Sequence, residues 1–162
     1  MLLAEAENSC KNNNLFPRIG EENLEVEHSS FTITANDLLC PHQYVVDGRN
    51  MLRLGDSISY VVARQVADTE NIFYGPYWML PPAVYLFWFH GELDGYFKID
   101  FADQEGGIIL KERTINNFID PLCLSVARTL ERFEVRGFRT PSLNAVRLDS
   151  IAVEAMRFPE RS

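Results

Sequence analysis

Acidic side chains that could do chemistry follow one another at the end of an apolar run. His90, Glu92 and Asp94 occupy alternate positions there. Two carboxylates can act as general acid and general base on a glycosidic bond, and carboxylate oxygens also bind Ca²⁺. Acidic residues at strand ends are more commonly solvated turn residues, and we favour that interpretation here.

Aromatic side chains form a second group, on a segment whose backbone is restricted by prolines at positions 76, 81 and 82. A pyranose ring can pack its C–H face on an aromatic ring while nearby polar groups bind its hydroxyls. We expect Tyr85, Phe87 and Phe89 to fill the core, since aromatic residues in strands usually do. The candidate ligand-binding residues are Tyr74, Tyr77, Trp78, Trp88, His90, Glu92 and Asp94.

No local signature of catalysis or cofactor binding occurs in the sequence. It contains no glycine-rich phosphate loop, HExxH, GxSxG or EF-hand pattern. Cys40 and His42 are close in sequence but lack further ligands at zinc-site spacing. We therefore assign no catalytic residue, no metal ligand and no cofactor, and the sequence favours a non-catalytic role.

The composition narrows the classes of partner. The chain has 162 residues, with 15 Lys and Arg against 23 Asp and Glu, a net charge of -8. An acidic protein is a poor nucleic-acid binder, because neutralising phosphates requires clustered basic residues. Residues 1–30 carry six acids and two bases, so half of the net charge lies in the N-terminal segment.

Targeting and cysteine patterns indicate a cytoplasmic protein. The first residues lack the basic and apolar regions of a signal peptide. The longest apolar run, residues 79–89, is too short to span a bilayer, so we expect no membrane insertion. Cys10, Cys40 and Cys123 are sparse and odd in number, which favours thiols in a reducing compartment.

The elements that must position these side chains are mostly strands. Short β-branched and aromatic runs are separated by turn signals such as Asp47-Gly48, Asp94-Gly95 and Thr140-Pro141. This spacing predicts an all-β protein with an antiparallel β-sandwich. We expect an irregular acidic arm over residues 1–23, one sandwich domain over residues 24–158, and short helical turns at residues 36–39 and 125–131.

Two strands have unusual patterns. The apolar parity of residues 145–156 changes at Ser150, which predicts a β-bulge or a change of packing environment. Residues 83–89 are apolar on both parities. Such a strand is either central and covered on both faces, or it displays an aromatic surface to a ligand.

Two segments carry a resemblance to a known class of domain. Residues 74–85, with the Gly-Pro-Tyr and Leu-Pro-Pro elements, resemble galactose-binding-like jelly-roll domains and carbohydrate-binding modules. Residues 133–153 resemble the last two strands of the same fold. The fold implies glycan, peptide, lipid or subunit binding, and in bacteria some such domains accompany enzymes of surface polysaccharides. Ala4-Glu5-Ala6-Glu7 resembles an opening strand whose Glu supports a structural Ca²⁺.

Three hypotheses follow. The first is a non-catalytic module that binds a glycan or polysaccharide through aromatic and polar residues. The second is a protein-interaction or oligomerisation module, accessory to a larger enzyme or assembly, in which the doubly apolar strand is buried against a partner or a second copy. The third is a small hydrolase or isomerase using His90, Glu92 or Asp94, which requires a concave pocket and a carboxylate of raised pKa.

Overall fold

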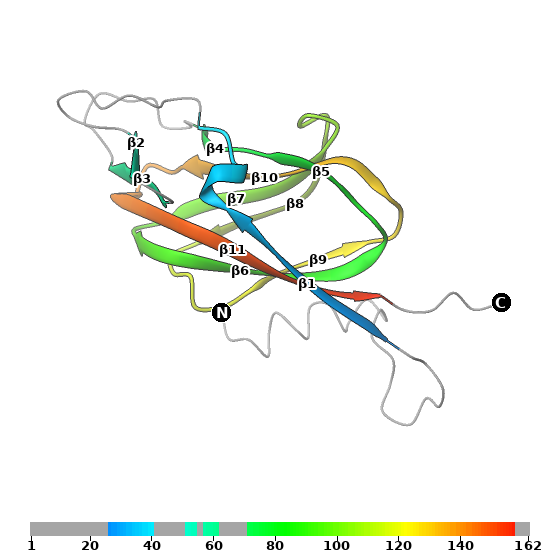
Figure 1. The fold of residues 1–162 in the computed structure, drawn as a ribbon. Coiled ribbons are helices and arrows are strands. Elements are labelled where there is room, and N and C mark those ends of the chain that lie inside the picture. The colour runs from blue at the N-terminus through cyan, green and yellow to red at the C-terminus, as the bar shows by residue number, and fades with distance from the viewer. Residues whose placement is uncertain (1–25, 41–50, 55–56, 62–70, 158–162) are drawn as a thin grey trace.

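Two antiparallel sheets make up the computed structural model, which describes residues 26–40, 51–54, 57–61 and 71–157. Figure 1 shows them as two stacked layers. The six-stranded sheet has the order β2 (Met51–Leu54), β3 (Ser57–Val61), β11 (Ala145–Arg157), β6 (Ala83–Asp94) and β9 (Leu122–Val126), with β1 (Glu27–Thr34) paired to β11. The five-stranded sheet has the order β4 (Asn71–Phe73), β10 (Leu130–Arg139), β7 (Phe97–Asp103) and β8 (Ile108–Ile115), with β5 (Pro76–Leu80) paired to β10.

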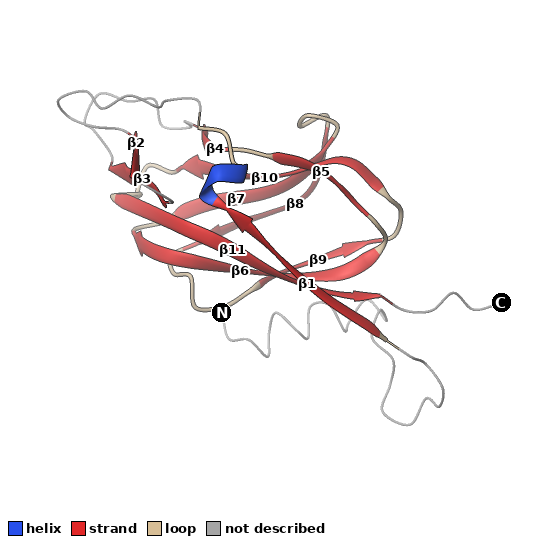
Figure 2. Cartoon of the chain, viewed as in Figure 1, coloured by secondary structure: helices blue, strands red, loops and turns tan. Residues whose placement is uncertain are grey.

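The architecture confirms the predicted all-β sandwich and is consistent with a jelly-roll-like fold. Strands dominate the described chain, and its one helical element is the 3-10 turn η1 (Ala35–Asp37) (Figure 2). This turn lies close to the one predicted at residues 36–39. The second predicted turn was wrong: in place of a helical turn at residues 125–131, β9 ends at Val126 and β10 begins at Leu130. The predicted arm, residues 1–23, lies outside the described residues.

The core lies between the two sheets and is rich in phenylalanine. Tyr85, Phe87 and Phe89 point inward from β6 and are 1%, 0% and 2% exposed, as predicted. The Phe87 ring centroid lies 4.5 Å from that of Phe101 on β7 and 5.7 Å from that of Phe133 on β10. These contacts join the two layers at their centre, so the period-two pattern of each strand determines which side chains meet.

Strand β6 is central and covered on both faces, one of the two possibilities for a doubly apolar strand. It pairs with β11 on one side and β9 on the other. Its other parity is also apolar, and there Val84 and Leu86 are only 2% and 5% exposed. These side chains belong to a separate cluster on the outer face of the six-stranded sheet.

The register between β6 and β11 shifts between Leu148 and Ser150, which confirms the predicted irregularity at Ser150. Gly91 lies opposite Leu148, with φ 153°. A Cβ atom on Gly91 would lie 1.8 Å from the carbonyl oxygen of Arg147. Glycine is therefore required at this close approach of the two backbones.

Candidate functional site

The structure divides the predicted site residues between two layers and one edge. Tyr77 lies on β5 in the five-stranded sheet, and Tyr74 lies between β4 and β5, where it forms an isolated bridge with Leu39. Trp88, His90, Glu92 and Asp94 lie on β6, in the six-stranded sheet. Trp78 follows Tyr77 on β5, and its ring lies 6.1 Å from that of Phe31 on β1, so it packs between the edges of the two sheets. The predicted residues therefore form more than one surface.

The outer face of the five-stranded sheet combines aromatic and charged side chains. On β10 the inward parity holds Phe133 and Val135, while Glu134, Arg136 and Phe138 have the opposite parity. On β7 the corresponding outward residues are Lys98 and Asp100, which lie opposite Phe138 and Arg136. We call the set of Tyr74, Tyr77, Lys98, Asp100, Arg132, Glu134, Arg136 and Phe138 the tyrosine face.

Tyr77 has an unusual backbone conformation. Its φ is 66°, in the left-handed region that bulky side chains rarely adopt. The guanidinium carbon of Arg132 lies 4.9 Å from the Tyr77 ring centroid, and the Tyr74 ring is 6.2 Å away in an edge-to-face arrangement. The Tyr77 hydroxyl donates a hydrogen bond to Glu134. Burial, together with the nearby charge of Glu134, raises the pKa of Tyr77 to about 12.

Glu134 is a buried carboxylate within the tyrosine face, with 2% of the residue exposed. Burial raises its pKa above the ordinary value of 4.5, although Arg136 and the Tyr77 hydroxyl favour the charged form. The desolvation of the carboxylate thus outweighs its favourable partners. The charge on Glu134 is sensitive to any group that approaches the face.

The free energy of unfolding of Glu134→Gln, relative to that of the native chain, is expected to increase as the pH rises. A raised pKa in the folded state contributes stability below the ordinary value of 4.5, and this contribution is lost as the pH rises through the raised pKa. Each tenfold difference in proton affinity amounts to about 1.4 kcal/mol. Urea unfolding of both proteins from pH 4.5 to neutrality measures the difference. Glu131→Gln, at an exposed position on β10, is the control and should show little pH dependence. If the difference in free energy of unfolding between Glu134→Gln and the native chain does not change with pH, the raised pKa of Glu134 is contradicted.

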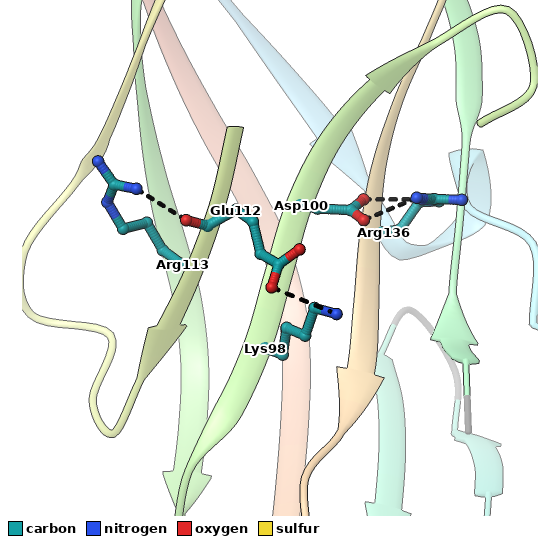
Figure 3. A network of polar contacts seen from close by, with 5 residues as sticks. All are labelled: Lys98, Asp100, Glu112, Arg113 and Arg136. Carbon is teal, nitrogen blue, oxygen red and sulfur yellow. Dashed lines mark hydrogen bonds and ion pairs between the residues drawn. The ribbon is translucent and has the colours of Figure 1, made fainter. Parts of the chain in front are cut away.

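Asp100 and Arg136 form a bidentate ion pair at the centre of the tyrosine face (Figure 3). Both nitrogen–oxygen distances are 2.7 Å, and the side chains are 2% and 17% exposed. Lys98 extends the network to Glu112 on β8 at 3.4 Å. The Lys98 and Arg136 cations also lie 5.1 and 5.2 Å from the Phe138 ring centroid. These contacts hold the charged side chains in fixed positions on the sheet.

The outer face of the six-stranded sheet has a polar half around Arg147. Its guanidinium contacts Glu92 at 3.4 Å and Asp149 at 3.1 Å. Ser57 donates a 2.6 Å hydrogen bond to Asp149. Hydrogen bonds from Ser57 and Arg147 lower the pKa of Asp149. His90 is exposed on β6 and lies close enough to Asp149 to favour its charged form.

A pocket of about 650 Å³ lies beside this polar half, lined by Ser59, Glu92, Leu93, Asp94, Ala145, Val146 and Arg147. Glu92 and Asp94 both line this pocket. The hydrolase hypothesis requires a carboxylate of raised pKa in such a pocket. Glu134, the carboxylate with the raised pKa, lies on the other layer. Among the described residues, no group of three or more His, Cys, Asp and Glu side chains is placed to hold a metal ion.

Trp88 lies on the outer face of the six-stranded sheet but is partly buried there, packed against Val84, Leu86 and Cys123. Within the described part of the chain its indole N–H is buried and makes no hydrogen bond. Trp78, in contrast, is 36% exposed. Of the predicted aromatic residues, Tyr77 is the one that the structure places within a network of polar side chains.

The sequence did not single out Glu134, Asp100 and Arg136 as site residues. The sequence did contain a signal for these residues. On one strand, Lys98 and Asp100 alternate with the apolar residues Phe97, Ile99 and Phe101. On the other, Glu134 and Arg136 alternate with Phe133 and Val135. Two such strands paired side by side place their polar parities on one face. The pairing itself, with Arg136 opposite Asp100, is visible only in the structure.

The cysteines differ from one another. Cys40 is buried in the main core and is not part of a disulfide. Cys123 lies with Val84 and Leu86 on the outer face of the six-stranded sheet and is disulfide-bonded, so the expectation of thiols throughout was wrong for this residue. No helix in the described ranges is long and apolar enough to span a membrane.

Comparison with known proteins gives no relative. No family model matches the chain, and no match was found among curated proteins or solved structures. We therefore infer a function from the residues and geometry of this chain.

Proposed function

We propose that the protein is a non-catalytic module that binds a glycan on the tyrosine face. The observation that carries the proposal is the conformation of Tyr77. A tyrosine with φ 66° costs conformational energy, and such strain is concentrated at functional sites. The strained residue presents an aromatic ring next to Glu134 and Arg132, on the outer surface of a rigid sheet.

The chemistry of the tyrosine face suits a polyhydroxylated ligand. The Tyr74 and Tyr77 rings offer apolar surface for the C–H face of a sugar. The guanidinium groups of Arg132 and Arg136 beside the rings can donate hydrogen bonds to hydroxyls. Because Asp100 already holds Arg136 in place, a ligand would find the Arg136 guanidinium preorganised and would bind without ordering it. The resemblance of residues 74–85 to carbohydrate-binding modules supports the same assignment.

Binding to a glycan array, followed by titration of the best ligand, tests the proposal. Tyr77→Ala is expected to weaken binding at least about tenfold, or about 1.4 kcal/mol, because it removes the ring and its bond to Glu134. Tyr77→Phe keeps the ring and should lose less. Tyr96→Ala is the matched control, since Tyr96 is 49% exposed and lies in the turn between β6 and β7. The absence of any bound glycan, or equal binding by Tyr77→Ala, would overturn the proposal.

A further inference from the structure

The turn between β7 and β8 carries an exposed ion pair at the border of the tyrosine face. The carboxylate of Glu105 lies 2.7 Å from Nη2 of Arg132, and the two side chains are 64% and 51% exposed. The Arg132 guanidinium also lies over the Tyr77 ring. The Glu105–Arg132 pair is thus open to solvent directly beside the aromatic ring that carries the proposed glycan contact.

The turn is fixed in position relative to the tyrosine face. Asp103 is buried, and its Oδ1 accepts hydrogen bonds from the backbone N–H groups of Gln104, at 2.9 Å, and Arg132, at 3.0 Å. These bonds anchor the turn to β10. A Cβ atom on Gly106 would lie 2.6 Å from Nη1 of Arg136, so the end of the turn packs closely against the face.

Backbone strain connects the turn with Tyr77. In the described ranges, the residues other than glycine with a positive φ are Tyr77 at 66°, Gln104 at 54° and Glu105 at 56°. Tyr77 is distant from the other two in sequence, yet Arg132 contacts both the Tyr77 ring and the Glu105 carboxylate. Such conformations cost energy and are concentrated at functional sites. Their meeting at one place indicates that the turn belongs to the same site as Tyr77.

The charged groups around the tyrosine rings already have partners of opposite charge. Arg132 pairs with Glu105, and Arg136 pairs with Asp100. Glu134 is buried, so a cation in solution does not reach its carboxylate. A charged ligand would have to break one of these pairs, whereas a hydroxyl would not, because carboxylates and guanidinium groups have more hydrogen-bonding positions than one contact occupies. The arrangement thus suits an uncharged ligand.

We propose that the Glu105–Arg132 pair determines the specificity of the glycan site and selects an uncharged sugar with two neighbouring hydroxyls. This inference rests on the proposed function and names its ligand class. One hydroxyl donates a hydrogen bond to the Glu105 carboxylate, and its neighbour accepts one from the Arg132 guanidinium. A sugar that packs its C–H face on Tyr77 carries its hydroxyls around the edge of its ring, where the pair lies.

A glycan array with three classes of glycan tests the charge of the ligand. The classes are neutral glycans, glycans with sulfate or carboxylate groups, and glycans with free amino groups. We expect the strongest binding to a neutral glycan, with an affinity that changes less than twofold between about 0.1 and about 0.5 M NaCl, because salt screens attraction between charges. Stronger binding to a charged glycan would overturn this inference and leave the proposed function standing. Absence of any bound glycan would overturn both.

Two alanine variants in the turn test the role of the pair. In titrations with the neutral glycan that binds best on the array, Glu105→Ala is expected to weaken binding about tenfold, since a hydrogen bond to a charged group is lost. The pair is exposed, so this variant should unfold at the native urea midpoint. Gln104→Ala is the matched control, because Gln104 is exposed and has nearly the same φ in the same turn.

Gln104→Ala should change binding less than about twofold, since its side chain lies outside the ion pair. Equal binding by Glu105→Ala and Gln104→Ala would overturn the assignment of the pair. In that case a loss of binding in Tyr77→Ala would still support the proposed function, so the two results are distinguishable.

Discussion

Replacing Arg136 with methionine is expected to lower the free energy of unfolding by about 3–5 kcal/mol, because it leaves a buried carboxylate unpaired. Asp100 is 2% exposed in its side chain and receives two 2.7 Å hydrogen bonds from Arg136. Methionine keeps the length of the side chain but offers no donor. The desolvated charge of Asp100 is then uncompensated. Urea unfolding followed by circular dichroism measures the loss.

Two further variants separate the ion pair from general packing. Arg132→Met removes a cation from the same strand, but its pair with Glu105, at 2.7 Å, is 51% and 64% exposed. Its cost should stay below about 1 kcal/mol. Replacing both partners, with Asp100→Leu added to Arg136→Met, should recover much of the stability, since the buried Asp100 carboxylate is removed together with its partner. An Arg136→Met protein as stable as the Arg132→Met protein would contradict this account.

Phe87→Ala is expected to destabilise the sandwich by about 3–5 kcal/mol, the range for removing a fully buried phenylalanine. Phe87 is 0% exposed, and its ring contacts Tyr85, Phe101 and Phe133. Since two of these rings come from the opposite sheet, the substitution opens a cavity at the junction of the layers. Thermal and urea unfolding of the variant measure the loss.

Phe87→Leu and Phe138→Ala are the matched controls for this prediction. Leucine refills most of the cavity, so its cost should be well below that of alanine. Phe138 is half-buried on the outer face, where its loss opens no enclosed space. A cost for Phe138→Ala equal to that of Phe87→Ala would contradict the placement of Phe87 at the centre of the core.

The fold class could be predicted because it depends on local patterns. Phe97, Ile99 and Phe101 alternate with polar residues, and this period of two determines which side of β7 is buried. The change of parity at Ser150 was also visible, since it lies within one strand. The segment at residues 125–131 was misread because a short connection between strands has no periodicity that separates it from a helical turn.

The tyrosine face could not be predicted, because its geometry depends on strand pairing and on one backbone angle. Asp100 and Arg136 are far apart in sequence and meet only through the register of β7 with β10. Simple alternation does not describe β5, since Tyr77 has a positive φ and the register with β10 shifts on this strand. As a result, Tyr77 joins the polar network of the face while the adjacent Trp78 packs at the edge near Phe31.

The position of β11 in the chain constrains how the protein can assemble during translation. Strands β1, β3 and β6 all pair with β11, which runs from Ala145 to Arg157. β1 and the β2–β3 pair are thus made early but can join the six-stranded sheet only after the ribosome has synthesised β11. Such long-range pairing is slow to form and leaves strand edges exposed in the meantime. The nascent chain consequently depends on β11 to complete this sheet.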